Sequence, residues 1–80
     1  MYYVYFLKSL IDSSKTYAGY TADIQKRLEM HNAGRSTYTD AHKPWELVSY
    51  VAFATKEKAI DFEKYTKAGS GYAFAKKRFW

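Results

Sequence analysis

The stretch that decides the fold is Tyr2-Tyr3-Val4-Tyr5-Phe6-Leu7, an unbroken apolar and aromatic run near the start of the chain. A short run without polar interruption is typical of a β-strand that is covered on both faces. Because side chains alternate along a strand, the odd-numbered residues are predicted on one face and the even-numbered residues on the other. We therefore expect a strand with other elements packed on both of its faces.

The residues that follow predict a hairpin and then a helix. Residues 9–15 are turn-like, and residues 16–20 (Thr-Tyr-Ala-Gly-Tyr) are expected to form the returning strand. Thr21 is a favourable N-cap for a helix over residues 22–33, and Gly34 is a common residue just beyond a helix end. The first half of the chain is thus predicted as strand, strand, helix.

The second half predicts one more strand and a second helix. Residues 35–43 are polar and are expected to form a loop that Pro44 closes. Residues 45–53 carry the apolar bulk of a third strand. Thr55 is the expected N-cap of a helix over residues 56–68.

The last residues predict a short terminal helix. The Gly-Ser-Gly triplet at 69–71 is expected to break the preceding helix, and residues 72–78 are expected to form another that carries a basic tail. The fold class is therefore α+β, a small three-stranded antiparallel sheet with flanking helices in the order β-β-α-β-α-α. With only 80 residues, we expect a single domain over residues 1–80.

Composition limits the classes of function. The chain has no cysteine, which excludes disulfides and thiolate metal ligands, and 20% of its residues are aromatic, which supplies a core. No apolar stretch approaches the roughly 20 residues that cross a bilayer, and the first residues do not resemble a signal peptide. We therefore expect a soluble cytoplasmic protein that does not bind membranes. A net charge of +5 favours polyanionic partners, although many small domains are basic for solubility alone.

Two polar residues of the first expected helix border its buried face. Ile24 and Leu28 lie four residues apart and define the face that packs on the sheet. Arg27 and His31 are also four apart, and at about 100° per residue they fall beside that face. Alternatively, Arg27 extends to water and His31 is favoured by the dipole at the helix end. The helix alone leaves both interpretations open.

Glu63 poses the same question on the second expected helix. It falls in angle between the inward-facing residues Ala59, Phe62 and Thr66. A buried carboxylate is costly unless it finds a cation, a metal ion or several hydrogen-bond donors. The alternative is a Glu63 at the edge of the face, paired with one of three lysines: Lys56, Lys64 or Lys67.

The strands add two tyrosines to this set. A strand tyrosine usually packs its ring in the core and sends its hydroxyl to the surface, and each of Tyr5 and Tyr17 taken singly fits that pattern. Together with Arg27, His31 and Glu63, however, they are predicted to face one patch of the sheet. Such a set suits phosphodiester chemistry, in which the protein positions groups and stabilises charge.

At these residues the chain resembles the GIY-YIG nuclease superfamily, and in particular its small stand-alone bacterial members. The first motif corresponds to Tyr3-Val4-Tyr5 and the second to Tyr17-Ala18-Gly19. The remaining matching blocks are Thr21 to Asn32, Pro44 to Val48, and Phe62-Glu63-Lys64-Tyr65 with the residues up to Lys77. The resemblance extends over nearly the whole chain, and five separated blocks are more specific than any one of them.

The resemblance implies a role for each residue of the set. Tyr5 would be the general base for the attacking water, and Tyr17 would orient that water or contact the scissile phosphate. Arg27 would bind the phosphate oxygens, and His31 would hydrogen-bond a phosphate oxygen or a tyrosine hydroxyl. Glu63 would be the sole protein ligand of a divalent metal ion, Mg²⁺ or Mn²⁺.

Elementary chemistry agrees with these roles. A free tyrosine has a pKa of about 10 and is a poor base at neutral pH. We expect Arg27 and a metal ion at Glu63 to favour its phenolate. Mg²⁺ usually keeps several waters and takes only one or two carboxylates, so a single glutamate suffices. One departure is that some nucleases of the superfamily carry an asparagine after the glutamate, and none follows Glu63 here.

The expected function is a metal-dependent endonuclease that cuts DNA with little sequence specificity, with RNA as an alternative substrate. The candidate phosphate contacts are Lys15, Arg35, Lys43, Lys76, Lys77 and Arg78. One alternative is a nucleic-acid-binding module of the same fold that does not cut, and another is a protein-interaction domain. Either a monomer or a weak homodimer is compatible with the sequence.

Overall fold

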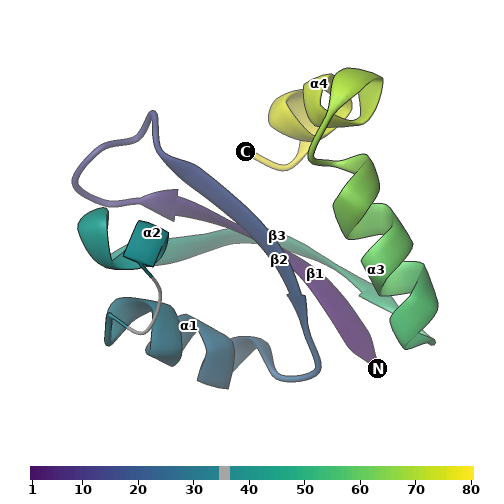
Figure 1. Cartoon of the computed structure of the whole chain (residues 1–80), viewed down its shortest axis with the longest axis horizontal. Coiled ribbons are helices and arrows are strands. Elements are labelled where there is room, and N and C mark those ends of the chain that lie inside the picture. Colours follow the sequence, from purple (N-terminus) through teal and green to yellow (C-terminus); the bar gives the residue numbers. More distant parts are fainter. Residues whose placement is uncertain (35–36) are drawn as a thin grey trace.

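The computed structural model describes residues 1–34 and 37–80 and shows a three-stranded antiparallel sheet. The strands are β1 (Tyr2–Ser9), β2 (Thr16–Thr21) and β3 (Trp45–Phe53), in the spatial order β2-β1-β3 (Figure 1). The predicted strand over residues 2–7 is confirmed; it is central in the sheet and continues to Ser9. The predicted bounds of the third strand are also confirmed.

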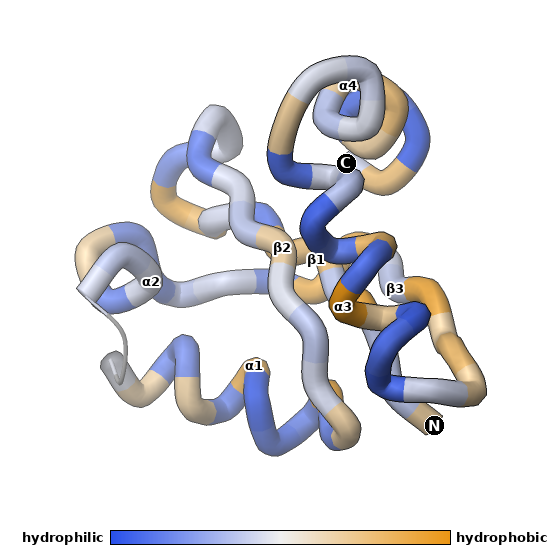
Figure 2. The backbone as a smooth tube through the Cα atoms, turned by 45° about the vertical axis from the view of Figure 1, so that its right-hand side comes forward, coloured by the Kyte–Doolittle hydropathy of each residue, from blue (hydrophilic) through white to orange (hydrophobic). Residues whose placement is uncertain are grey.

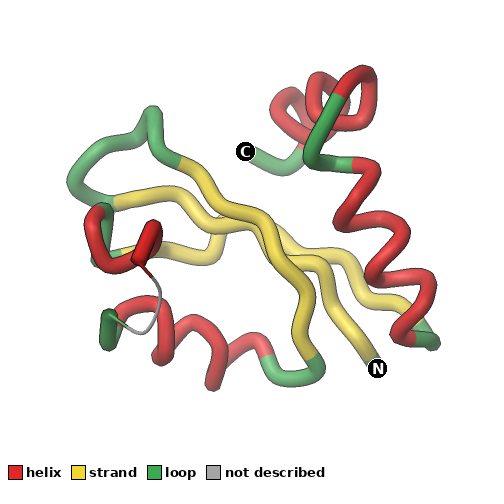
Figure 3. The backbone as a smooth tube through the Cα atoms, viewed as in Figure 1, coloured by secondary structure: helices red, strands yellow, loops and turns green. Residues whose placement is uncertain are grey.

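In the described part of the chain, four helices flank the sheet. They are α1 (Ile24–Asn32), α2 (Thr37–Ala41), α3 (Lys56–Tyr65) and α4 (Gly69–Arg78). The helices α1 and α2 lie on one side of the sheet, and α3 and α4 lie on the other (Figures 1 and 3). The predicted α+β class and the order β-β-α-β-α-α are confirmed, with α2 as an additional short helix.

The two faces of β1 contact different sets of residues. Val4 and Phe6 pack with Ala18, Ala59 and Ala75 on the α3 side. On the α1 side, the buried residues Tyr5, Leu7 and Trp45 form a second cluster. The predicted alternation of odd- and even-numbered residues is therefore confirmed. Figure 2 shows hydrophilic residues along much of α1, in which His31 is buried.

The start of α1 differs from the prediction. The N-cap is Asp23, whose Oδ1 accepts a hydrogen bond of 3.0 Å from the Lys26 amide, whereas Thr21 was expected in this position. The Thr21 hydroxyl instead accepts a hydrogen bond from the amide of Asp23 and so shapes the turn that leads from β2 into the helix. The helix therefore begins at Ile24. It is followed by Gly34, whose φ of +80° favours glycine.

The predicted loop over residues 35–43 is wrong in its middle, where α2 forms. Thr39 of α2 is completely buried, and its carbonyl accepts a hydrogen bond of 2.8 Å from the Trp45 indole. These contacts are tertiary, so the local sequence, which is polar, does not indicate them. Residues 35 and 36 lie outside the described part of the chain.

The boundary between α3 and α4 also differs from the prediction. Thr55 is the N-cap of α3, as expected, but the helix ends at Tyr65 and not at residue 68. The next helix begins at Gly69, so the Gly-Ser-Gly triplet belongs to α4. A Cβ at Gly71 would overlap the backbone carbonyl of Tyr65. The glycine therefore permits close packing of α4 against the end of α3.

The C-terminal residues close the α3 side of the sheet. The Phe79 ring stacks on Phe6 with ring centroids 4.6 Å apart, and the Trp80 indole donates a hydrogen bond of 2.9 Å to the Leu7 carbonyl. Among the residues that the structure describes, no helix has the length and apolar character needed to span a membrane.

Candidate active site

Tyr5 lies at the centre of the candidate site. Its side chain extends from the middle of β1 toward α1, and only 1% of the residue is exposed. The Tyr5 hydroxyl lies 2.8 Å from Nε2 of His31, within hydrogen-bonding distance. This contact joins the central strand to the end of α1, which are 26 residues apart in the chain.

Gly19 makes room for the Tyr5 ring. The two residues pair across β1 and β2. A Cβ at Gly19 would lie 2.6 Å from the Tyr5 hydroxyl oxygen and 3.2 Å from Cε2 of Tyr17. Any side chain here would therefore displace one of the tyrosines. The glycine of the second motif is required by this close approach, which the sequence alone did not indicate.

His31 is held from both sides. The residue is 4% exposed, and its Nδ1 lies 3.0 Å from the hydroxyl oxygen of Thr39 in α2. Its ring centroid is 4.9 Å from that of Tyr17, in an edge-on arrangement. Thr39 therefore belongs to the candidate site, although sequence reasoning missed it. Only the tertiary placement of α2 makes this threonine different from its polar neighbours.

Arg27 lies one turn before His31 on α1 and is half-buried. It lines a hollow of about 240 Å³ together with four other residues: Thr21, Asp23, Lys26 and Met30. Its guanidinium acts electrostatically on both Tyr5 and His31. The predicted pairing of Arg27 with His31 beside the buried face of the helix therefore agrees with the geometry.

Burial and the neighbouring charges keep both Tyr5 and His31 neutral at neutral pH. Burial is the main cause that raises the pKa of Tyr5 well above its ordinary value, and the neighbouring Tyr17 adds to this effect. The positive charge of Arg27 lowers the Tyr5 pKa, in the expected direction, but is outweighed. Burial, followed by the charge of Arg27, lowers the pKa of His31. At neutral pH the structure therefore holds a phenol against a neutral imidazole.

Glu63 reaches the cluster from α3. Its side chain is 16% exposed, and its Oε2 forms an ion pair of 3.1 Å with Nζ of Lys67. That Nζ also lies 5.4 Å from the centroid of the Tyr17 ring. The carboxylate is close enough to Tyr5 to contribute to the increase of its pKa. The alternative pairing of Glu63 with a lysine thus occurs, and Lys67 is the residue that forms it.

The structure therefore brings all five predicted site residues together around the β2 side of the sheet. Tyr5 contacts His31 directly, its ring centroid lies 6.2 Å from that of Tyr17, and Arg27 and Glu63 act on its hydroxyl from two different helices. Lys67 is a further neighbour that sequence reasoning did not place in the site. It was considered only as an ion-pair partner of Glu63.

The predicted phosphate contacts are more scattered. Lys43 lies beyond α2 and pairs with Asp40 at 2.9 Å, whereas the basic tail lies at the end of α4 (Figure 1). In that tail, Lys76 lies over the Trp80 ring and Arg78 over the Phe74 ring, and Lys77 is exposed. Lys15 is half-buried at the end of the turn before β2. Arg35 lies outside the described residues.

The donor set near Tyr5 suits one kind of metal ion. Within residues 1–34 and 37–80, no group of three or more His, Cys, Asp or Glu side chains is placed to hold a metal. Glu63 offers a single half-buried carboxylate, of which Oε2 pairs with Lys67. A single carboxylate suits a hard cation such as Mg²⁺, which completes its coordination shell with water and phosphate oxygens. It does not fit a structural zinc site.

Comparisons with known proteins identify the family and several relatives of this chain. The family model described as the GIY-YIG catalytic domain matches residues 1–75. A UPF0213 protein of Bacillus pumilus is 48% identical over 63 residues, which are 78% of this chain and 62% of that protein. The UPF0213 protein YazA of Bacillus subtilis is 44% identical over 52 residues, which are 64% of this chain and 52% of that protein. The chain thus spans less than two thirds of the length of these relatives.

A solved structure shares the fold. The solution structure of a UPF0213 protein of Bacillus halodurans aligns with a TM-score of 0.56 at 30% sequence identity. The alignment covers 99% of this chain and 87% of that one. The sheet and its flanking helices are therefore common to both proteins.

Proposed function

Because the chain belongs to the GIY-YIG family, we propose that it is a divalent-metal-dependent endonuclease that hydrolyses phosphodiester bonds in DNA with little sequence specificity. The observation that carries the proposal is the buried Tyr5 hydroxyl, which lies 2.8 Å from His31 and within electrostatic reach of Arg27 and Glu63. These groups supply a base, a phosphate-binding cation and a metal ligand around one point. Cleavage of a phosphodiester requires little else from the protein.

Tyr5 and His31 act together as the base. Because its pKa is raised, Tyr5 does not start as a phenolate. His31 is neutral, so its Nε2 accepts the Tyr5 proton while Nδ1–H donates to the Thr39 hydroxyl. As the phenol proton moves to His31, the Tyr5 oxygen takes the proton of the attacking water. The buried histidine thereby makes a tyrosine of raised pKa useful as a base.

Arg27 and Tyr17 bind the phosphate. The guanidinium of Arg27 offers several N–H donors to the phosphate oxygens, where negative charge increases as water attacks. The positive charge of Arg27 also lowers the Tyr5 pKa. The same cation therefore favours both the phosphate and the Tyr5 phenolate. Tyr17, whose ring lies beside those of Tyr5 and His31, contacts the attacking water or the scissile phosphate.

Glu63 would hold the metal ion, Mg²⁺ or Mn²⁺. When bound, the ion supplies Lewis-acid stabilisation of the leaving oxygen. Lys67 occupies the same carboxylate at 3.1 Å, so it competes with the metal for Glu63. Metal binding at Glu63 would therefore require Lys67 to release this oxygen.

The substrate is bound mainly through its backbone. A net charge of +5 and basic groups at Lys43 and along 76–78 supply sequence-independent attraction to phosphates. Affinity is therefore expected to fall steeply with added salt. These contacts suit DNA and RNA alike.

The proposal is tested by incubating purified protein with plasmid, branched and single-stranded DNA in Mg²⁺, Mn²⁺ or EDTA. Two site variants are compared with matched controls on exposed positions, Glu63→Gln with Glu57→Gln and Arg27→Ala with Lys64→Ala. We expect metal-dependent nicking by the wild type and by both controls. Each site variant is expected to lose about 10²–10³-fold in rate while remaining folded.

Two other results would replace the proposal. Salt-sensitive binding of DNA without any metal-dependent cleavage would identify a binding module of the same fold. Binding that ignores salt, or no binding at all, would point to a protein-interaction domain. Cleavage that survives Glu63→Gln would show that the metal ligand lies elsewhere.

A further inference from the structure

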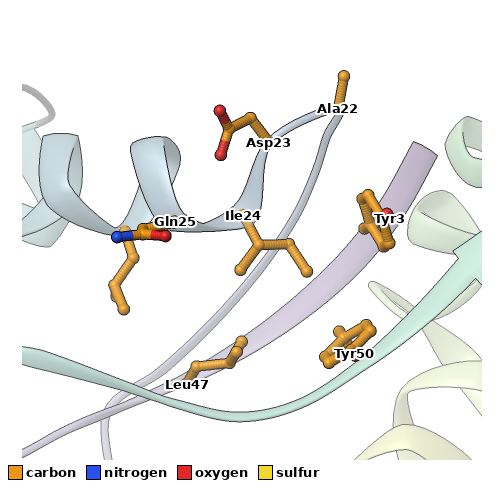
Figure 4. A pocket seen from close by; sticks show the side chains of 8 residues that line it. Tyr3, Ala22, Asp23, Ile24, Gln25, Leu47 and Tyr50 are labelled. Atoms are coloured by element: carbon orange, nitrogen blue, oxygen red, sulfur yellow. The ribbon is translucent and has the colours of Figure 1, made fainter. Parts of the chain in front are cut away.

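A second hollow lies on the other side of α1 from Arg27. It has a volume of about 470 Å³, and it is bordered by the start of α1 and by strands β1 and β3 (Figure 4). Its walls contain the aromatic pair Tyr3 and Tyr50 and the aliphatic side chains of Ile24, Leu28 and Leu47. This volume is within the range of about 300–1,000 Å³ that is usual for sites of small ligands.

The aromatic pair gives this hollow flat walls. Tyr3 and Tyr50 lie side by side on the sheet with ring centroids 5.8 Å apart and nearly perpendicular planes. Tyr50 is 55% exposed on the edge strand β3, so its ring is available to a ligand. A ring that enters from outside meets an aromatic surface on one side and aliphatic groups of α1 on the other.

The charges around the two hollows differ in sign. Among the described residues, no lysine or arginine lines the larger hollow, and its one carboxylate is that of Asp23. Asp23 also lines the smaller hollow, where Lys26 and Arg27 supply two positive charges. In a chain of net charge +5, the larger hollow is thus unsuited to a phosphate, while its neighbour suits one.

These observations fit one ligand with an uncharged aromatic part and an anionic part. We propose that the larger hollow binds an unstacked nucleobase of the strand whose phosphate lies at Arg27. The base stacks on Tyr50, opposite the aliphatic side chains of Ile24 and Leu28. The inference rests on the proposed function and adds the substrate class.

The substrate class follows from the geometry of the base. A base within a duplex is paired and stacked, so it does not reach a hollow in a protein unless it is extruded. Single-stranded or branched nucleic acid offers unstacked bases without this cost. The enzyme is therefore specific for substrates with an unpaired base beside the cleaved bond.

The test measures binding in EDTA, where no cleavage occurs. The affinity of a fluorescently labelled single-stranded oligonucleotide is compared with that of an abasic oligomer of the same length and charge. We expect Tyr50→Ala to weaken binding of the base-containing strand by about 5- to 150-fold, the equivalent of ~1–3 kcal/mol of stacking. Binding of the abasic oligomer is expected to stay unchanged. The control Tyr65→Ala removes a tyrosine of similar exposure, 48%, on α3 and should alter neither affinity.

A second readout locates the base. Methyl resonances of Ile24, Leu28 and Leu47 are expected to shift with the base-containing strand and not with the abasic one. If Tyr50→Ala weakens both oligomers equally or neither, or if the methyl shifts are the same for both, the hollow does not bind a base. If the wild type binds neither oligomer, the proposed function itself fails.

Discussion

The two faces of β1 are built from adjacent residues and serve different purposes. On the α3 side, Val4 and Phe6 are completely buried in an apolar cluster with alanines of three other elements. On the α1 side, Tyr5 is equally buried, but its hydroxyl contacts His31, which in turn contacts Thr39. Strand alternation alone separates an apolar face from a polar one, one residue apart.

This difference shows how so small a chain carries a polar cluster in its interior. A buried polar group is costly unless it is hydrogen-bonded. Within the part of the chain that the structure describes, every buried side-chain nitrogen and oxygen has a partner. The α3 face of β1 then supplies apolar burial, and the α1 face holds the Tyr5–His31 pair, which Glu63 approaches from α3.

The largest expected effect on stability comes from removing a side chain on the apolar face of β1. Phe6→Ala removes a ring that stacks on Phe79 and meets Trp80, and it is expected to lower the free energy of unfolding by about 3–5 kcal/mol. Urea denaturation measures this loss. Any fraction that remains folded should cleave DNA at the wild-type rate per molecule. A folded but inactive Phe6→Ala would show that the two faces are not independent.

Gly19→Ala should act mainly on the polar face. The new Cβ would lie 2.6 Å from the Tyr5 hydroxyl oxygen, so Tyr5 must move. We expect a loss of about 1–3 kcal/mol in stability from overpacking and a fall of about 10²-fold in cleavage rate from the misplaced base. Gly69→Ala is the matched control. Its φ of +61° strains an alanine, but no atom lies within 4 Å of the added Cβ, so no side chain is displaced. It should lose stability and keep its rate.

The smallest expected effect is a pH dependence of stability that comes from His31. Its pKa is lowered in the folded protein, so unfolded chains take up a proton first as the pH falls through about 6.5. The contribution of the neutral, buried His31 imidazole to the free energy of unfolding is therefore largest above that pH and decreases below it. Thermal unfolding between pH 5 and 8 measures the slope. His31→Gln should flatten it, whereas His42→Gln, which retains His31, should leave it unchanged.

Much of the fold was predictable because its signals are local. The continuous apolar run at 2–7, the strand at 45–53 and the Thr55 N-cap are properties of neighbouring residues. The errors lie where distant contacts decide. The helix α2 forms around the buried Thr39, and Gly71 permits packing against Tyr65 in a triplet where a helix break was expected.

In the candidate site, too, local patterns were predictable from the sequence and distant contacts were not. Periodicity placed Arg27 and His31 beside the buried face of one helix, and it placed Glu63 on that of another. What it does not provide is the partner of each group. Thr39 was missed because its contact with His31 depends on how α2 packs, and Gly19 was not seen as the residue that admits the Tyr5 ring.

The central claim is that the Tyr5 hydroxyl performs the chemistry while its neighbour Phe6 maintains the fold. The most direct measurement is the single-turnover cleavage rate of Tyr5→Phe in Mg²⁺, together with its free energy of unfolding. This variant keeps the ring and removes only the oxygen that contacts His31. We predict a rate loss of at least about 10²-fold with a stability loss of only about 1–3 kcal/mol. A Tyr5→Phe variant that cleaves DNA at the wild-type rate would contradict the account.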